Sequence, residues 1–565
     1  MKKKTLKKFI GLLSNNNIDG YVIPKNDSFF TEQVKHNRLK LITNFTGSAG
    51  LAVILKKKRY LFVDSRYTIQ AKLESGTNYE IVKIHQKLPR NLFQNIILGY
   101  DPNIFTFDQL NYLFGNNIKL KSIKKNLVDQ IFKVKKIKDK PFYSLPNHVS
   151  GESHQSKVNL ISKYLKKKKA DFLFISAPEN VAWLLNIRGS DTPYSPLPNS
   201  NLLLAKNKKL YLIAKKFKTK KLIIEKKLSL NQIVEIDDFA SFIQNLKGKR
   251  FVIDNKTLSV FNENTIKSKF KIICRNDPCY FFKSIKNQTE MQNMIQSHIL
   301  DGVAVTKFLF WIKNLKKIKV TEIDAEKKLE SLRKKNKKYL YPSFGTIAGS
   351  GPNGAIVHYR ATKKTNRIIS KKDLFLCDSG GQYKYGTTDV TRTISLGEQP
   401  KKIKNIFTLV LKGHIAVATS NLIKNNTGKK LDVHARKFLK RQKLDYGHGT
   451  GHGVGYFLNV HEGPQSISKF GKVKLKEGMI LSNEPGYYKQ GQYGIRIENL
   501  VYIRKDNEKM FFENLTLAPI DKELINYSLL STKEKDYLFN YHLSVYSKIS
   551  KHLNNSEKKW LIKNL

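Results

Sequence analysis

Two aspartates in the second half of this 565-residue chain lie where a pair of strands is expected to bring them together. Asp378 follows the apolar run 374–377, which predicts a buried strand, and Asp389 lies in residues 387–393, which are expected to form the returning strand. Two carboxylates held side by side repel each other, so both stay ionised only if a cation lies between them. The simpler alternative is that Asp378 starts a turn and Asp389 pairs with Arg392.

A segment rich in glycine and histidine follows. Residues 448–455 read His-Gly-Thr-Gly-His-Gly-Val-Gly, so His448 and His452 stand among four glycines, and His461 follows nine residues later. Glycine lets the backbone approach a ligand closely while the imidazoles face it. A lone histidine is usually structural, but a run rich in histidine and glycine, followed by a third histidine, makes a poor core and favours a functional site.

Two glutamates and an arginine follow the histidines. Glu484 directly follows residues 479–483, which read as an apolar strand, and it comes just before a Pro-Gly turn. Arg496 and Glu498 are two residues apart, so on a strand both face one side while the neighbouring isoleucines face the core. This pattern predicts a buried polar site, and the alternative is a pair of surface carboxylates in a lysine-rich protein.

These clusters give a mainly oxygen-donating set of metal-ligand candidates: Asp378, Asp389, His452, Glu484 and Glu498. Such a set suits hard or borderline divalent cations. Four carboxylates exceed what one ion needs, so we expect two metal ions about 3.5–4 Å apart with a bridging hydroxide as the nucleophile. Because such ions lower the pKa of water from about 15.7 toward 7 and polarise a carbonyl, the predicted reaction class is metal-assisted hydrolysis.

Two similar stretches in the first half of the chain indicate an internal duplication. The expected strands 21–24 and 59–64 of the first stretch correspond to the strands 171–175 and 210–213 of the second. The repeat is far longer than the unit of a solenoid.

The expected fold class is α/β (α+β) with three domains. The two similar α/β domains are placed at 1–150 and 155–285, with 146–151 as a hinge between them. The third domain, 287–565, carries the candidate site and begins with a helical pattern of apolar residues over 294–311.

The charge of the chain is strongly positive, with 103 Lys and Arg against 45 Asp and Glu and a formal net charge of +58. A nucleic-acid partner is one explanation. However, the lysines are scattered over the whole chain, and Lys, Asn and Ile share AT-rich codons. We therefore favour solvated faces shaped by genomic composition over a nucleic-acid role.

The cysteines and apolar runs bear on the location of the protein. Three cysteines without a CxxC spacing indicate neither a disulfide framework nor a thiolate zinc site, which favours the cytoplasm. The apolar run 9–13 near the basic N-terminus is shorter than the roughly 7–15 residues of a signal-peptide core. No run approaches the roughly 18 apolar residues of a membrane helix, so we expect a protein without a membrane partner.

Taken together, the motifs resemble those of the pita-bread metallopeptidases, and specifically the three-domain aminopeptidase P (Xaa-Pro aminopeptidase) family. The most specific are Asp-Ser-Gly at 378–380, Gly-Thr-Thr-Asp-Val-Thr-Arg-Thr at 386–393, His-Gly-Thr-Gly-His-Gly at 448–453, His-Glu-Gly-Pro at 461–464 and Asn-Glu-Pro-Gly-Tyr-Tyr at 483–488. The resemblance covers almost the whole chain. It implies two creatinase-like N-terminal domains followed by a pita-bread catalytic domain with a C-terminal extension.

The resemblance also implies roles for residues. The five ligand candidates match the dinuclear metal ligands of this family, with Mn²⁺ as the usual ion and Co²⁺ or Zn²⁺ as alternatives. His358 and His461 match residues that bind substrate or move protons at the scissile bond, and His448 and Arg496 match supporting residues of the catalytic site. Arg66 matches a substrate-facing arginine of the first domain.

The expected function is therefore removal of the N-terminal residue from peptides whose second residue is proline, by a cytoplasmic homodimer. Proline nitrogen carries no N–H, and its tertiary amide must be polarised and then protonated as it leaves, which suits the nearby histidines. One alternative is a prolidase-like dipeptidase that acts on Xaa-Pro with the same ligands. Another is a non-catalytic binding protein on the same scaffold.

Overall fold

The computed structural model describes residues 3–132, 140–315 and 319–563. The chain forms two compact units, Met1–Cys279 and Tyr280–Leu565, and each is described by itself. The helix α12 (Pro278–Ser284) spans the point where one unit ends and the next begins.

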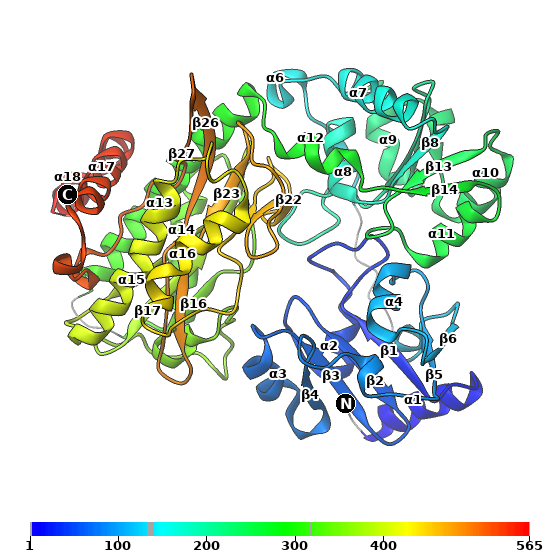
Figure 1. Cartoon of the computed structure of the whole chain (residues 1–565), viewed down its shortest axis with the longest axis horizontal. Coiled ribbons are helices and arrows are strands. Elements are labelled where there is room, and N and C mark those ends of the chain that lie inside the picture. The colour runs from blue at the N-terminus through cyan, green and yellow to red at the C-terminus, as the bar shows by residue number, and fades with distance from the viewer. Residues whose placement is uncertain (1–2, 133–139, 316–318, 564–565) are drawn as a thin grey trace. The chain divides into compact units, whose positions relative to one another are not determined.

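The first unit contains two six-stranded sheets, whose strand orders are β4-β3-β2-β1-β5-β6 and β12-β11-β10-β8-β13-β14 (Figure 1). The strands of the first sheet are β1 (Gly20–Pro24), β2 (Leu51–Leu55), β3 (Arg59–Val63), β4 (Glu80–Lys83), β5 (Ile97–Tyr100) and β6 (Lys119–Ser122). Those of the second are β8 (Phe172–Ile175), β10 (Asn201–Ala205), β11 (Leu210–Ile213), β12 (Ile233–Val234), β13 (Arg250–Ile253) and β14 (Lys271–Cys274).

The two sheets correspond strand for strand. In each sheet the first three strands along the chain pair antiparallel, and the remaining pairings are parallel. All residues of the central strands β1 and β8 are buried, as is typical of strands covered on both faces. The predicted duplication is confirmed.

Helices connect the strands of both sheets. Those of the first sheet are α1 (Lys3–Asn15), α2 (Arg38–Thr43), α3 (Thr68–Ser75), α4 (Phe107–Phe114) and α5 (Leu127–Ile131). Those of the second are α7 (His154–Lys167), α8 (Pro178–Leu185), α9 (Lys216–Ile224), α10 (Phe239–Asn245) and α11 (Val260–Lys267). The predicted hinge at 146–151 contains the single-turn helix α6 (Asn147–Ser150), and bending there stays a prediction.

The second unit is a mixed α/β structure in which helices lie on both sides of short sheets. Its strands are β15 (Tyr339–Pro342), β16 (Ile347–Ser350), β17 (Leu374–Ser379), β18 (Gly381–Tyr383), β19 (Gly386–Thr387), β20 (Val390–Ser395), β21 (Gly451–Gly453), β22 (Glu462–Ile467), β23 (Ile480–Asn483), β24 (Gly486–Lys489), β25 (Tyr493–Arg496), β26 (Asn499–Asp506) and β27 (Lys509–Asn514). The larger sheets have the orders β16-β17-β20 and β22-β21-β23-β26-β27. The α/β fold class is as predicted.

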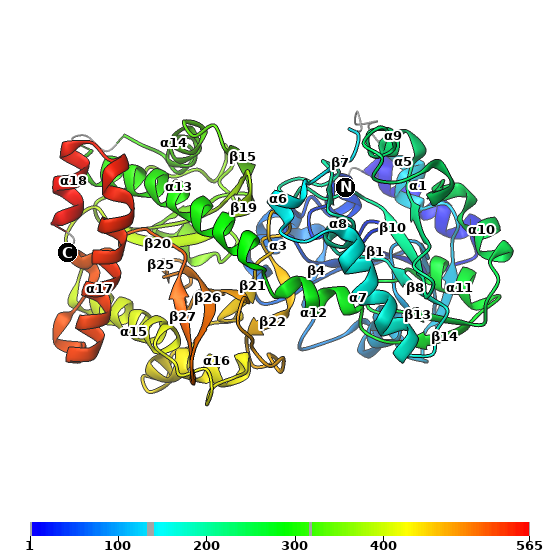
Figure 2. The ribbon, with the colours of Figure 1, turned by 90° about the horizontal axis from the view of Figure 1, so that it is seen from above.

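Two pairs of helices flank these strands. The pair α13 (Gln288–Lys313) and α14 (Glu322–Lys334) lies on one side, and the pair α15 (Lys401–Ala418) and α16 (Gly428–Lys440) on the other (Figure 2). The terminal helices α17 (Thr532–Ile549) and α18 (Asn555–Ile562) lie side by side in both views. The predicted helical pattern at 294–311 falls within α13, which begins at a capping box of Asn287 and Glu290.

The prediction of a single returning strand over 387–393 is wrong. A small hairpin of β18 and β19 intervenes, in which Gln382 pairs with Thr387. The hairpin packs closely against α13, where a Cβ on Gly386 would lie 2.3 Å from Ser297 Oγ, so a side chain does not fit at this position. The returning strand is β20, and Asp389 lies directly before it, while β20 Thr391 pairs with Asp378 of β17.

Arg392 binds the far side of β20 rather than Asp389. Its guanidinium is buried and donates to the backbone oxygens of Glu498, Ala518 and Pro519, and to Asn499 Oδ1 and Tyr541 Oη. Side chains alternate along a strand, so Thr391 and Thr393 face the opposite side from Arg392. The alternative partner proposed for Asp389 is therefore excluded.

None of the helices in the described parts of the chain combines the length and the apolar character needed to cross a bilayer.

Candidate metal centre

The five predicted ligands arrive from the ends of different strands of the second unit. Asp378 lies in β17, Asp389 before β20, His452 in β21, Glu484 directly after β23, and Glu498 between β25 and β26. The hydrogen-bonded strands fix the backbone at these positions. The sheets therefore hold the five candidate ligands in the same region of the second unit.

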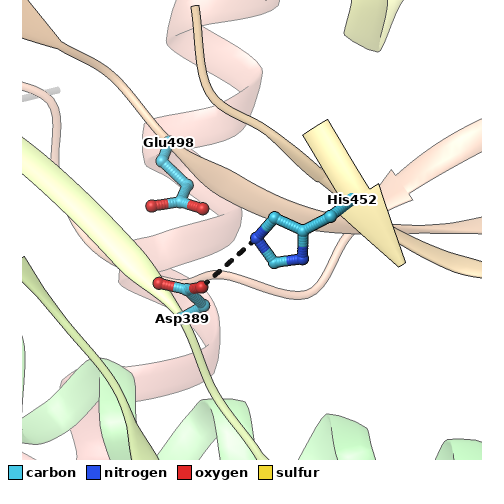
Figure 3. Close-up of side chains that lie close together, drawn as sticks. All are labelled: Asp389, His452 and Glu498. Carbon is cyan, nitrogen blue, oxygen red and sulfur yellow. Dashed lines mark ion pairs between the residues drawn. The ribbon is translucent and has the colours of Figure 1, made fainter. Parts of the chain in front are cut away.

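Three of these residues form a group that fits a metal ion. Ligand atoms of Asp389, His452 and Glu498 all lie within 4.8 Å of one another (Figure 3). His452 Nε2 lies 3.7 Å from Asp389 Oδ2 and 3.5 Å from Glu484 Oε1, which brings Glu484 to the same imidazole.

Two carboxylate oxygens of the site lack a hydrogen-bond donor. Asp378 Oδ2 accepts a hydrogen bond from Arg496 Nη2 at 2.6 Å, but Asp378 Oδ1 and Asp389 Oδ1 are buried and unsatisfied in the described part of the chain. Buried polar atoms are almost always satisfied, and an unsatisfied carboxylate oxygen next to an imidazole matches the donor set of a divalent cation. The residues present therefore fit the metal that the sequence predicts.

Burial and mutual repulsion shift the protonation of these groups. Burial, followed by repulsion from Glu498 and Asp378, raises the pKa of Asp389 well above its usual range. Burial and repulsion from Glu484 raise the pKa of Glu498 in the same way. Burial raises the pKa of Glu484 to about 7, although Arg496 acts in the opposite direction. All of these carboxylates are ionised together only when a cation compensates their charge.

Arg496 and Thr391 hold two of the carboxylates in place. The Arg496 guanidinium is buried, and its Nε donates to Thr391 Oγ1 at 3.1 Å. Thr391 Oγ1 in turn donates to Glu498 Oε2 at 2.7 Å. The predicted orientation of Arg496 and Glu498 toward one side is therefore correct, although β25 ends at Arg496 and Glu498 lies outside it.

Tyr488 links Arg496 to His448. Its hydroxyl oxygen lies 2.6 Å from Arg496 Nη1 and 2.9 Å from His448 Nε2. The structure thus places His448 beside the arginine that binds Asp378. Its predicted part in catalysis stays a prediction.

The other two predicted histidines, His461 and His358, lie next to residues of the candidate site or next to residues bonded to it. The ring centroid of His461 lies 4.3 Å from that of His452, and the two rings are edge-on to each other. His358 stands between Val357, whose carbonyl lies 3.5 Å from Arg496 Nη2, and Tyr359, whose hydroxyl donates to Glu322 Oε2 at 2.8 Å.

Sequence reasoning missed several supporting residues. Ser482 Oγ accepts from the backbone N–H of His452 and donates to Glu484 Oε1 at 3.0 Å. Glu322 also accepts from backbone N–H groups of the segment that carries His358. Tyr488 lies in a motif that the sequence singles out, but Glu322 gives no sequence signal because its partners are 28 to 45 residues away.

Arg66 belongs to the first unit. Its guanidinium forms a two-pronged contact with Asp64, at 2.7 Å for the shorter pair. The side chain is thus oriented, and its contact with substrate stays a prediction.

The signature of metallopeptidase family M24 matches residues 292–505, and that of its C-terminal region matches 508–565. The creatinase/prolidase N-terminal domain matches twice, at 5–131 and 133–290.

Relatives span nearly the whole chain. A probable Xaa-Pro aminopeptidase P of Paracoccidioides brasiliensis is 34% identical and covers 97% of this chain and 96% of its own. One of Laccaria bicolor is 35% identical, with 96% and 90% covered. The crystal structure of an X-prolyl aminopeptidase from Caenorhabditis elegans, described as a cytosolic enzyme with a dinuclear active site, matches with a TM-score of 0.91 at 30% identity over 99% of this chain and 98% of that chain.

The chain therefore belongs to metallopeptidase family M24, with two creatinase-type N-terminal domains before a pita-bread catalytic domain. The predicted family and architecture are confirmed.

Asp389→Asn and Glu498→Gln should each weaken Mn²⁺ binding more than about 100-fold, since even outer partners of metal ligands are worth about 10- to 100-fold. Titration calorimetry on metal-stripped protein measures the affinity. Glu513→Gln, which changes a partly exposed carboxylate paired with Arg504, is the matched control and should bind Mn²⁺ normally. Unchanged affinity in both site variants would exclude these ligands.

Stabilisation by metal should grow with pH. In metal-free protein the pKa of Glu484 is about 7 instead of 4.5, so its protonated form favours the fold below pH about 4.5 and this stability is lost as the pH rises through 7. Metal binding needs the ionised carboxylates and removes their repulsion. The increase in melting temperature caused by Mn²⁺ should therefore be larger at pH 8 than at pH 5, and the reverse order would contradict the repulsion.

Proposed function

We propose that this chain is a metal-dependent aminopeptidase that hydrolyses the N-terminal Xaa-Pro bond of peptides. The observation that carries the proposal is the group of Asp389, His452 and Glu498, in which both carboxylates are buried and His452 is half-buried, with His461 edge-on to His452. The full-length relatives named Xaa-Pro aminopeptidase P support the choice of substrate.

The domain content favours an aminopeptidase over a dipeptidase. The match to the C. elegans aminopeptidase covers 99% of this chain with a TM-score of 0.91. The match to the prolidase from Pyrococcus furiosus covers 63% of this chain, but 98% of that protein, with a TM-score of 0.51. Much of this chain thus has no counterpart in the prolidase.

Two divalent ions are the proposed cofactors, with Mn²⁺ as the working ion and Co²⁺ or Zn²⁺ as alternatives. Asp378, Asp389, His452, Glu484 and Glu498 would hold them. The ions supply a nucleophile from water at neutral pH and polarise the scissile carbonyl. Oxygen-rich donors suit Mn²⁺, and the dinuclear site described for the C. elegans enzyme supports the number of ions.

The chain's own residues then orient the peptide and move protons. His461 is proposed to give a proton to the proline nitrogen as that nitrogen leaves, and the exposure of its imidazole beside His452 supports this role. His358 is proposed to bind the substrate, and Arg66 of the first unit to contact it. Arg496, which is joined to His448 through Tyr488, is proposed to keep Asp378 oriented.

A cytoplasmic homodimer completes the proposal. The description of the C. elegans enzyme as cytosolic supports the location. So does the finding that Cys274, Cys279 and Cys377 form no disulfide within the described residues. Exposed Phe539 and Leu543, four residues apart on one face of α17, support self-association. Neither a nucleic acid nor a membrane is part of the proposal.

Metal-stripped protein should regain activity with Mn²⁺ and release the N-terminal residue from an Xaa-Pro-Xaa tripeptide. Chromatographic detection of the freed amino acid measures the activity. An Xaa-Ala-Xaa tripeptide of the same length is the matched control and should be cleaved far more slowly. Cleavage of an Xaa-Pro dipeptide alone would identify a prolidase, and no cleavage of any peptide would refute the proposal.

A further inference from the structure

Glu462, the residue that follows His461, is buried together with two lysines from a distant part of the sequence. Glu462 Oε2 accepts a hydrogen bond from Lys283 Nζ at 2.7 Å, and Glu462 Oε1 accepts one from Lys286 Nζ at 2.8 Å. Each of the three side chains is at most 1% exposed. We call Lys283, Lys286 and Glu462 the lysine–glutamate triad.

Stability alone does not explain this triad. Moving charges out of water costs several kcal/mol per ion, and apolar residues of similar volume are often at least as stabilising as a buried ion pair. Burial alone would raise the pKa of Glu462, but the two lysines have the larger effect and lower the pKa below its usual value. The carboxylate therefore stays ionised. One carboxylate between two ammonium groups leaves an excess positive charge, which Lys286 relieves by contacts with the carbonyls of Lys283 and Ser284.

Glu462 is packed against the segment that carries His452. It begins β22 and pairs with Gly453 of β21. A Cβ on Gly455 would lie 2.8 Å from Glu462 Oε2, and a Cβ on Gly453 would lie 2.4 Å from the Glu462 carbonyl oxygen. Residues 453 and 455 must therefore lack a side chain, because Glu462 approaches the backbone closely at both positions.

His461 itself is exposed, whereas the next residue, Glu462, is buried. The imidazole projects from backbone that is continuous with Glu462, so a shift of that backbone would move the ring. That backbone is fixed one residue later by two ion pairs and by the pairing with β21.

We propose that the lysine–glutamate triad positions His461 for proton transfer: Lys283 and Lys286 hold Glu462, and Glu462 holds the backbone that places the His461 ring beside His452. The inference rests on the proposed aminopeptidase function. The three residues act through His461 and are positioning residues.

Lys286→Met tests the triad without leaving an unpaired buried charge, because Lys283 and Glu462 remain as a balanced pair. For a tripeptide with proline second, kcat should fall about 10- to 100-fold, since a misplacement of about 1 Å can cost about 100-fold. KM and bound Mn²⁺ should not change. Lys469→Met, an exposed lysine beyond the end of β22, is the matched control and should keep full kcat.

A second background separates positioning from a general loss of packing. In His461→Ala protein, Lys286→Met should lower kcat no further, because the residue through which it acts is gone. A full additive loss in the double variant would overturn the proposal, as would unchanged kcat in Lys286→Met. Lys283→Met, which leaves the Lys286–Glu462 pair, should give the same results and replaces Lys286→Met if that variant does not fold.

The position of the His461 ring gives a readout that does not need activity. In a crystal structure of Lys286→Met, the ring should move away from its edge-on contact with His452. An unmoved ring would overturn the proposal even if kcat fell. Failure of the proposed function would instead show as wild-type protein that cleaves no tripeptide, while the ring position still decides the role of the triad.

Discussion

The mutual repulsion of buried carboxylates is the constraint on which the second unit depends. Asp378, Asp389, Glu484 and Glu498 come from separate strand ends, and the packed sheets hold them together against their own charge. Without compensation, burial keeps Asp389 and Glu498 protonated over a wide pH range. Divalent cations bound among these carboxylates would replace this repulsion with attraction, so the site as folded favours metal binding.

Fixed donors on neighbouring strands support the ligands. Arg392, on the face of β20 opposite to Thr391, donates a hydrogen bond to the backbone carbonyl of Glu498. Arg496 donates one to the carboxylate of Asp378. The hydroxyl of Thr391 lies between Arg496 and Glu498 and accepts from one while donating to the other. Arg496 and Thr391 thus each satisfy one carboxylate oxygen, of Asp378 and Glu498 respectively, and the other oxygens are the ones proposed to bind the ions.

Much of this could be predicted from the sequence because the informative residues are close together in it. The apolar runs before Asp378 and Glu484 predict strands, and the glycines around His452 predict a close approach of backbone. The duplication follows from the same local patterns, and the two sheets repeat one strand order.

The errors and omissions arise where distant residues decide the structure. In the hairpin before Asp389, Gly386 packs against Ser297 of α13, a contact that no local pattern shows. Glu322 and Glu462 read as ordinary acidic residues, yet Lys283 holds Glu462 across 179 residues of sequence. Such contacts exist only after the chain has folded, so residue types and spacing cannot reveal them.

We infer that these carboxylates and His452 together bind divalent cations. A crystal structure of Mn²⁺-saturated protein, with anomalous differences recorded at the manganese absorption edge, tests it most directly. We expect two anomalous peaks among Asp378, Asp389, His452, Glu484 and Glu498, each in contact with their side-chain oxygens or with His452 Nε2. Fully ordered side chains at these positions with no anomalous peak between them would contradict the account.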